Sequence, residues 1–318
     1  MNSSDSSKPL VSAVITTHNR AHLLPRAINS VLQQTYQNME IIVVDDNSQD
    51  DTPSVAKRYE GQIKYHRLQQ DTGGVAVRTR MAGNALAGGE FVAFLDDDDQ
   101  WFPTKIERQI DAFLQAPENC SVSTCGARIQ SSVSKREKKP VINGDIRAGM
   151  LNHGLSTIPS CHLFKKSLFD QMGGYDLDLP AHNEHDIWMK MADRGYCAVA
   201  VRESLVLLIE DSRPRMMTDV GRRVEAFETF YNKWADKVCE WYGAKVGKKF
   251  LKQYMTQKML GNARGIAQSG NRAGAMLMIH RSMRFFNISM VRKLFPTIAY
   301  LFLPCSAVKL LSKIKQSL

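Results

Sequence analysis

The order of apolar and amphipathic segments in the first third of the chain limits the folds that it can adopt. Short apolar runs alternate with segments in which apolar residues recur at helical spacing. This alternation is typical of βαβ units, in which helices cover both faces of a mostly parallel sheet. The expected strands are Val11–Thr16, Met39–Asp45, Ile63–Leu68 and Glu90–Leu95, and the expected helices are Leu23–Leu32, Asp51–Tyr59, Val75–Leu86 and Pro103–Leu114.

The rest of the chain divides into a mixed part and a helical part. Its 318 residues favour about two domains. We expect a disordered tail over residues 1–9, an α/β domain over 10–211 with halves 10–115 and 116–211, and an all-helical region over 212–318. Inside the second half we expect the strand Cys161–Phe164, the helices Lys165–Met172 and His185–Arg194, one or two strands within Cys197–Ile209, and an exposed basic loop at Ser131–Pro140.

Charge is divided unevenly along the chain. Residues 1–211 carry 22 Lys+Arg and 27 Asp+Glu, a net charge of −5, whereas residues 212–318 carry 20 and 5, a net charge of +15. Within the basic part, Leu294–Val308 has 15 residues without a charge, interrupted by two prolines and flanked by Lys and Arg. Because a spanning helix needs about 20 apolar residues, we expect this segment to lie on an anionic membrane surface. The alternative is a terminal helix packed on the preceding domain with a solvated cationic face.

The cysteines and the N-terminal residues indicate the cellular compartment in which we expect the protein. Six cysteines without a repeating pattern exclude a disulfide scaffold, and we expect free thiols in a reducing compartment. The polar start of the chain has no apolar core of a secretory signal. No nucleic-acid-binding motif accompanies the basic region, so we expect no nucleic-acid partner.

Acidic clusters follow two of the expected strands. Asp45 and Asp46 end the second strand, and Asp96–Asp99 follow the fourth, while Thr16 ends the first. Ligands of open α/β sheets bind beyond the carboxyl ends of the strands. Four adjacent carboxylates repel one another unless a cation neutralises them, and their hard oxygen atoms suit Mg²⁺ or Mn²⁺. The alternative for the run is a solvated turn or a helix cap.

Three blocks of this sequence together resemble the family 2 glycosyltransferases: VSAVITTHNR with LLPRAINSVLQQTYQNMEIIVVDDNSQDDT, then GGEFVAFLDDDDQWFPTKI, then GGYDLDLPAHNEHDIWMKMADRG. The resemblance implies a GT-A fold, a nucleotide-diphospho-sugar donor and a divalent metal, Mn²⁺ or Mg²⁺. It assigns Asp98 to the metal and the other matched positions to the donor, namely Thr16, Asp46, Arg78, Asp96 and Asp97. The register along the four aspartates is open by one residue.

Glu184 matches the position of the catalytic carboxylate of that family. The more usual sequence there is Glu-Asp or Gln-Asp, whereas this chain has Asn183 followed by Glu184, so its base is longer by one methylene group. A carboxylate of either length can take a proton from a sugar hydroxyl. The alternative is that Glu184 only caps the helix that follows. On resemblance, the acceptor side includes Ser160, Cys161, His185 and Asp186.

These observations predict an inverting glycosyltransferase with a UDP-sugar donor and a glycan acceptor, carried on a lipid, in bacterial surface polysaccharide or O-antigen lipopolysaccharide synthesis. The expected location is cytoplasmic, peripheral on the inner face of the cell membrane. One alternative is a nucleotidyltransferase, but HNRAHLLPR lacks a Gly-rich loop with Lys for phosphates. The other is a non-catalytic module that binds a sugar nucleotide or a membrane, which would not need a base at Glu184.

Overall fold

A computed structural model describes residues 8–73, 75–131, 135–153, 155, 158–179, 181–210 and 219–285. Residues 1–7 of the expected tail and the apolar segment Leu294–Val308 lie outside the described residues. The chain divides into two compact units. Unit 1 lies within Met1–Leu177 and Asn183–Asp211, and unit 2 lies within Asp178–His182 and Ser212–Leu318.

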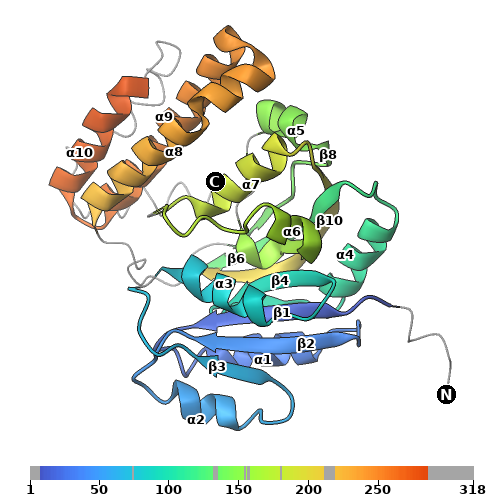
Figure 1. Cartoon of the computed structure of the whole chain (residues 1–318). Coiled ribbons are helices and arrows are strands. Elements are labelled where there is room, and N and C mark those ends of the chain that lie inside the picture. The colour runs from blue at the N-terminus through green and yellow to red at the C-terminus, as the bar shows by residue number, and fades with distance from the viewer. Residues whose placement is uncertain are drawn as a thin grey trace. The chain divides into compact units, whose positions relative to one another are not determined.

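Unit 1 is built on one mixed β-sheet (Figure 1). Its strands lie in the order β3 (Lys64–Arg67), β2 (Met39–Asp45), β1 (Val11–Thr17), β4 (Phe91–Asp96), β9 (His162–Lys165), β6 (Cys120–Ser131), β10 (Cys197–Glu210) and β5 (Asp99–Trp101). The first four strands are parallel to one another, and β9 and β5 run antiparallel to their neighbours. In addition, β7 (Lys135–Lys138) pairs with β6, and β8 (Gly144–Asp145) pairs with β10.

Helices cover both faces of this sheet, which confirms the expected α/β fold (Figure 1). One face packs on α1 (Leu24–Leu32), α2 (Thr52–Lys57) and α4 (Lys105–Leu114), whose apolar residues form one core cluster with β1 and β4. The other face carries α3 (Ala76–Leu86), α6 (Lys166–Gln171) and α7 (Asn183–Asp193). There α3 approaches so closely that a Cβ on Gly83 would collide with Val14. The connections add α5 (Ile146–His153) and the 3₁₀ turn Pro159–Cys161.

Three features of unit 1 differ from the expectations. The segment Ser131–Pro140 is not only a loop, because Lys135–Lys138 pairs with β6 as the second strand of a hairpin. The short strand β5 follows directly on the aspartate run, which the sequence did not indicate. Cys120 and Cys197 begin adjacent strands in register and are joined as a disulfide with a Cα–Cα distance of 4.4 Å, so the expectation of free thiols is wrong for this pair.

The described part of unit 2 contains α8 (Val220–Tyr242), α9 (Ala244–Gln268), α10 (Arg272–Ser282) and the 3₁₀ turn Met283–Phe285. Gly243, with a φ of 79°, separates α8 from α9 in a backbone conformation that L-residues rarely adopt. His182, which precedes α7 in the sequence and belongs to this unit, packs its ring on Phe227, with ring centroids 3.9 Å apart. Among the described residues, no helix is both long enough and apolar enough to cross a membrane.

Candidate active site

The carboxyl ends of three parallel strands bring the expected donor residues to one edge of the sheet. Thr16 of β1 is in register with Asp96 of β4 on one side and with Val44 of β2 on the other. The Thr16 hydroxyl lies 3.5 Å from the Asp96 carboxylate. Asp46 follows β2 directly, and its N–H donates to the Thr17 carbonyl at 2.9 Å. Thr16, Asp46 and Asp96 therefore meet at this edge, as the sequence predicts.

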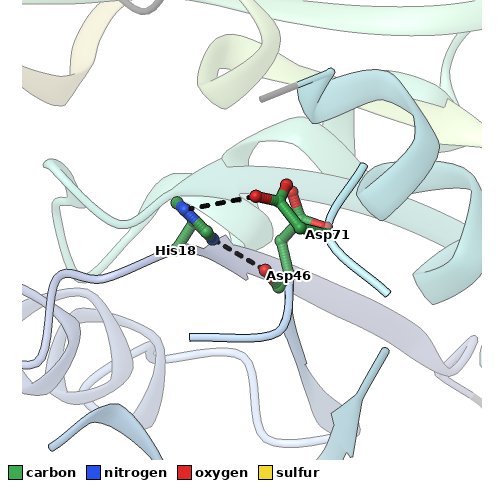
Figure 2. A group of neighbouring side chains, drawn as sticks. All are labelled: His18, Asp46 and Asp71. Atoms are coloured by element: carbon green, nitrogen blue, oxygen red, sulfur yellow. Dashed lines mark hydrogen bonds and ion pairs between the residues drawn. The ribbon is translucent and has the colours of Figure 1, made fainter. Parts of the chain in front are cut away.

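Asp46 is held by the segment that leads into α3. Its carboxylate accepts hydrogen bonds from the N–H of Thr72 at 2.9 Å and from the Thr72 hydroxyl at 2.7 Å. The Asp46 carbonyl accepts from Nδ1 of His18 at 2.7 Å, and Nε2 of His18 lies 3.9 Å from Asp71 (Figure 2). His18, Asp46 and Asp71 thus point toward one another from three separate loops (Figure 2). The hydrogen bonds from Thr72 and His18 fix the loop that carries Asp46.

Arg80 is a central residue of the site that the sequence analysis did not identify. Its guanidinium donates to Asp96 at 2.6 Å and to Glu184 at 3.2 Å, and its side chain is 4% exposed. Burial alone would lower the pKa of Arg80, but the two carboxylates raise it above its usual value. The helical spacing of the sequence could have shown that Arg80 is buried, because Val77, Arg80 and Asn84 lie on one buried face of α3.

Arg78, the residue expected near the donor, lies on a different side of the same helix. It is exposed, and its guanidinium donates to the carbonyl of Leu177 at 3.3 Å. Its role in donor binding stays a prediction.

Arg20 and Arg80 offset part of the charge of the aspartate run, and Ser160 donates a hydrogen bond to it. Arg20 binds Asp97 at 2.8 Å and Asp98 at 2.9 Å, and the Ser160 hydroxyl donates to Asp99 at 2.5 Å. The side chain of Asp97 is 4% exposed, whereas that of Asp98 is 41% exposed. Burial raises the pKa of Asp97 to about 6 despite Arg20, and burial followed by the charge of Asp96 raises the pKa of Asp99 well above its usual value. Asp97 is thus turned into the protein, and Asp98 faces the open side.

The carboxylate oxygen atoms of this aspartate run are suitable ligands for a divalent cation. One carboxylate oxygen from each of Asp96, Asp98 and Asp99 lies within 4.8 Å of the other two. Three hard oxygen atoms at this spacing are the ligand type that Mg²⁺ and Mn²⁺ prefer.

Glu184 lies in the first turn of α7, and its side chain is 29% exposed. It therefore reaches both the buried Arg80 and the open side of the site. The residues expected on the acceptor side divide into two classes. Ser160, Cys161 and Asp186 are buried, and their role on the acceptor side stays a prediction. His185, next to Glu184, is partly exposed.

Comparisons with known proteins agree with this arrangement. A family model described as glycosyl transferase family 2 matches residues 12–173. An uncharacterized glycosyltransferase of Rickettsia prowazekii, RP339, is 33% identical over 192 residues, which cover 57% of this chain and 58% of that protein. The chain thus spans little more than half the length of this relative. The putative glycosyltransferase EpsE of Bacillus subtilis is 27% identical over 213 residues, 65% of this chain and 75% of EpsE.

Solved structures show the same fold. Staphylococcus aureus TarS in complex with UDP-GlcNAc has a TM-score of 0.61 at 15% identity and covers 77% of this chain and 71% of its own. The mannosyltransferase PcManGT of Pyrobaculum calidifontis, in complex with GDP-Man and Mn²⁺, has a TM-score of 0.55 at 19% identity and covers 96% and 88%.

Proposed function

Because the chain belongs to glycosyltransferase family 2, we propose that it transfers a sugar from a UDP-sugar to a hydroxyl group of a glycan, with inversion at the anomeric carbon. The observation that carries this proposal is the link through Arg80, which joins Asp96 at the donor edge of the sheet to Glu184. A binding module has no need of a partly exposed carboxylate that is linked in this way to the donor edge of the sheet.

We assign each step of the proposed reaction to a residue. Asp46 accepts a hydrogen bond from the imide N–H of uracil, a role that suits its anionic side chain. Asp98, with Asp96 and Asp99, would hold Mn²⁺ or Mg²⁺, which when bound neutralises charge on the diphosphate. Glu184 removes the proton of the acceptor hydroxyl, whose oxygen attacks the anomeric carbon from the side opposite the diphosphate. The bond to the diphosphate breaks as the new bond forms, so an α-linked donor gives a β-glycoside.

The acceptor and the location form a separate part of the proposal. We infer that the acceptor is a glycan on a lipid carrier and that the enzyme works at the inner face of the cell membrane. The support is the net charge of +15 over residues 212–318 and the names of relatives, among them a putative teichuronic acid biosynthesis glycosyltransferase of Bacillus subtilis. Cosedimentation with anionic and with neutral vesicles tests this part, and equal absence from both pellets would overturn it.

Calorimetry of nucleotide binding tests the reaction. We expect UDP to bind more tightly than GDP, CDP or dTDP, and only in the presence of Mn²⁺ or Mg²⁺. Asp98→Ala should lose the metal-dependent binding, whereas Glu184→Gln should keep it and lose release of UDP from a UDP-sugar in the presence of an acceptor extract. Nucleotide binding without turnover by the unaltered chain would favour a binding module, and release of pyrophosphate from UTP in the presence of a sugar 1-phosphate would favour a nucleotidyltransferase.

A further inference from the structure

A groove of about 440 Å³ lies in the part of unit 1 formed by residues 116–211 and the end of β5. Its walls come from the β6–β7 hairpin, from the middle of β10 and from the residue that follows β5. The aromatic and charged residues that line it are Phe102, Arg128, Glu137, Lys139, Arg202 and Glu203.

Local irregularity in β10 creates this groove. The pairing of β10 with β6 shifts register between Val201 and Ser204 and again before Val206, so Arg202 and Glu203 are displaced from the ladder and exposed. On β6, Gly126 allows the displaced backbone to come close, because a Cβ there would lie 2.9 Å from the Glu203 carbonyl oxygen. A bulge of this kind redirects side chains at functional sites.

The cations of the groove differ in whether a carboxylate pairs with them. The Arg128 guanidinium lies 5.1 Å from the ring centroid of Phe102 and 3.5 Å from Glu137, which fixes its orientation. Glu203 lies 3.6 Å from Arg108 at the rim. Within the described ranges, Lys139 and Arg202 have no ion-pair partner. The groove therefore has two cations without counterions beside a third that is held in place.

This concentration of positive charge is an exception in its surroundings. Residues 1–211 have a net charge of −5, yet the segment 135–139 carries four Lys or Arg and one Glu. Edge strands often carry lysine to prevent aggregation, and this accounts for β7 taken alone. It does not account for Arg202, which comes from β10 between β6 and β5, or for Arg128 stacked on an aromatic ring.

One end of the groove lies close to the aspartate run. Phe102 comes three residues after Asp99, and β5 pairs with β10 from Asp99 opposite Leu208 to Trp101 opposite Val206. Along extended chain, Phe102 is therefore roughly 10 Å from Asp99, and Arg202 is roughly 20 Å from Leu208. A glycan of several sugar units is long enough to cover this separation.

We propose that this groove binds the acceptor glycan through its negatively charged groups, so that the natural acceptor is an anionic glycan with carboxylate or phosphate groups. This inference rests on the proposed transferase function and names its acceptor class. The planar fork of an arginine matches both groups with two parallel hydrogen bonds. Lys139 adds a positive charge on a flexible side chain, which can follow the anionic groups of a repeating polymer when its conformation varies.

The test uses the full chain and three oligosaccharide probes of equal length. An oligogalacturonate presents carboxylates, an oligo(glycerol phosphate) presents phosphates, and a malto-oligosaccharide is neutral. Binding is measured by fluorescence anisotropy for the unaltered chain, for the variant Lys139→Glu/Arg202→Glu, and for the matched control Lys57→Glu/Arg58→Glu. The control makes the same change of charge at exposed positions of unit 1 outside the groove.

We expect at least one anionic probe to bind and the groove variant to lose affinity by about tenfold or more, while the control variant and the neutral probe show no such change. Whichever anionic probe binds more tightly identifies carboxylate or phosphate as the group recognised. The proposal is overturned if the groove variant and the control variant bind the anionic probes with equal affinity. It is also overturned if the unaltered chain binds duplex DNA or anionic vesicles more tightly than the glycan probes and the groove variant loses that binding. Binding of UDP, GDP, CDP and dTDP by every variant is measured in parallel. Absence of binding of all four by the unaltered chain refutes the proposed donor site and leaves the groove result to stand separately.

Discussion

Asp96 and Glu184, which come from different blocks of the sequence, accept hydrogen bonds from one guanidinium, that of Arg80. This buried cation fixes the carboxylate at the end of β4 relative to the carboxylate in the first turn of α7. Taking a guanidinium out of water is costly, and two carboxylates offset that cost only while both contacts persist. The two halves of the proposed reaction centre therefore depend on one side chain.

Replacing Arg80 should damage both activity and stability. In Arg80→Met, Asp96 and Glu184 lose their common partner and repel each other, so we expect turnover to fall by about 100-fold and the free energy of unfolding to fall by about 3 kcal/mol. Arg80→Lys keeps the charge but not the two-pronged geometry and should recover stability more than turnover. Product formation and urea unfolding measure both effects. Arg58→Met, an exposed arginine on unit 1, is the control, and an equal effect there would contradict this role of Arg80.

Thr72 should control nucleotide affinity without controlling turnover. Its hydroxyl donates to the carboxylate of Asp46 at 2.7 Å, so Thr72→Val removes one of the bonds that orient Asp46. We expect the dissociation constant of UDP to rise roughly 3- to 10-fold, with the rate at saturating donor unchanged. Thr72→Ser retains the hydroxyl and should behave like the unaltered chain. A fall in the saturated rate with unchanged affinity would show that Thr72 acts elsewhere.

His182 should make unit 2 sensitive to mild acid. Burial, with the nearby charges of Lys258 and Arg223, lowers the pKa of His182 to about 3. The unfolded chain, with an ordinary histidine pKa of about 6.5, binds a proton that the folded chain does not, so stability is complete above about pH 6.5 and declines as the pH falls toward 3.

The comparison with His182→Asn isolates this contribution, because asparagine tolerates the left-handed φ of 67° at this position. Between pH 8 and pH 5, the unaltered chain should lose roughly 2 kcal/mol more of its unfolding free energy than the variant. The measurement is urea unfolding at both pH values. Identical losses in the two proteins would show that His182 is not buried in its neutral form.

Lys105 should be a destabilising residue. Its side chain is fully buried, its Nζ lies 4.0 Å from the ring centroid of Trp101, and among the described residues it has no hydrogen-bond partner. Burial lowers its pKa to about 8. Because the unfolded chain retains the proton up to about pH 10.5, the folded state is least favoured below pH 8 and gains stability as the pH rises from 8 to 10.5.

The expected result of Lys105→Met is a gain of about 1 to 3 kcal/mol at pH 7 that shrinks toward pH 10. Thermal unfolding at the two pH values measures it. A loss of stability at pH 7 would mean that the contact with Trp101 outweighs the cost of burial.

The parts of the fold that follow from local periodicity could be predicted, and the parts that depend on tertiary partners could not. The strands β1, β2 and β4 follow from apolar runs bounded by polar residues, and their order on one edge brings Thr16, Asp46 and Asp96 together as expected. The strand β7 has an all-charged sequence, and only its partner β6 makes it a strand. Cys120 and Cys197 are 77 positions apart, and only the register of two parallel strands pairs them.

Burial of the expected site residues could not be predicted. Resemblance of sequence assigns Ser160, Cys161 and Asp186 to the acceptor side, which stays a prediction, but it does not tell whether a side chain faces solvent. Arg80 could have been found from its place on the buried face of α3, where an arginine needs carboxylate partners. The partners themselves, Asp96 and Glu184, belong to separate blocks, so no local pattern pairs them.

The contacts of Arg20 and Arg80 also bear on how fast a donor can reach the site. Four consecutive aspartates would surround this edge of the sheet with a negative field that repels an incoming diphosphate over about a Debye length, near 8 to 10 Å. Arg20 lies within 2.9 Å of Asp97 and Asp98, and Arg80 lies 2.6 Å from Asp96, so these charges form compact dipoles whose field decays over a shorter distance. The two guanidiniums offset part of this negative charge, so an anionic donor meets weaker long-range repulsion on its approach than four unpaired aspartates would exert.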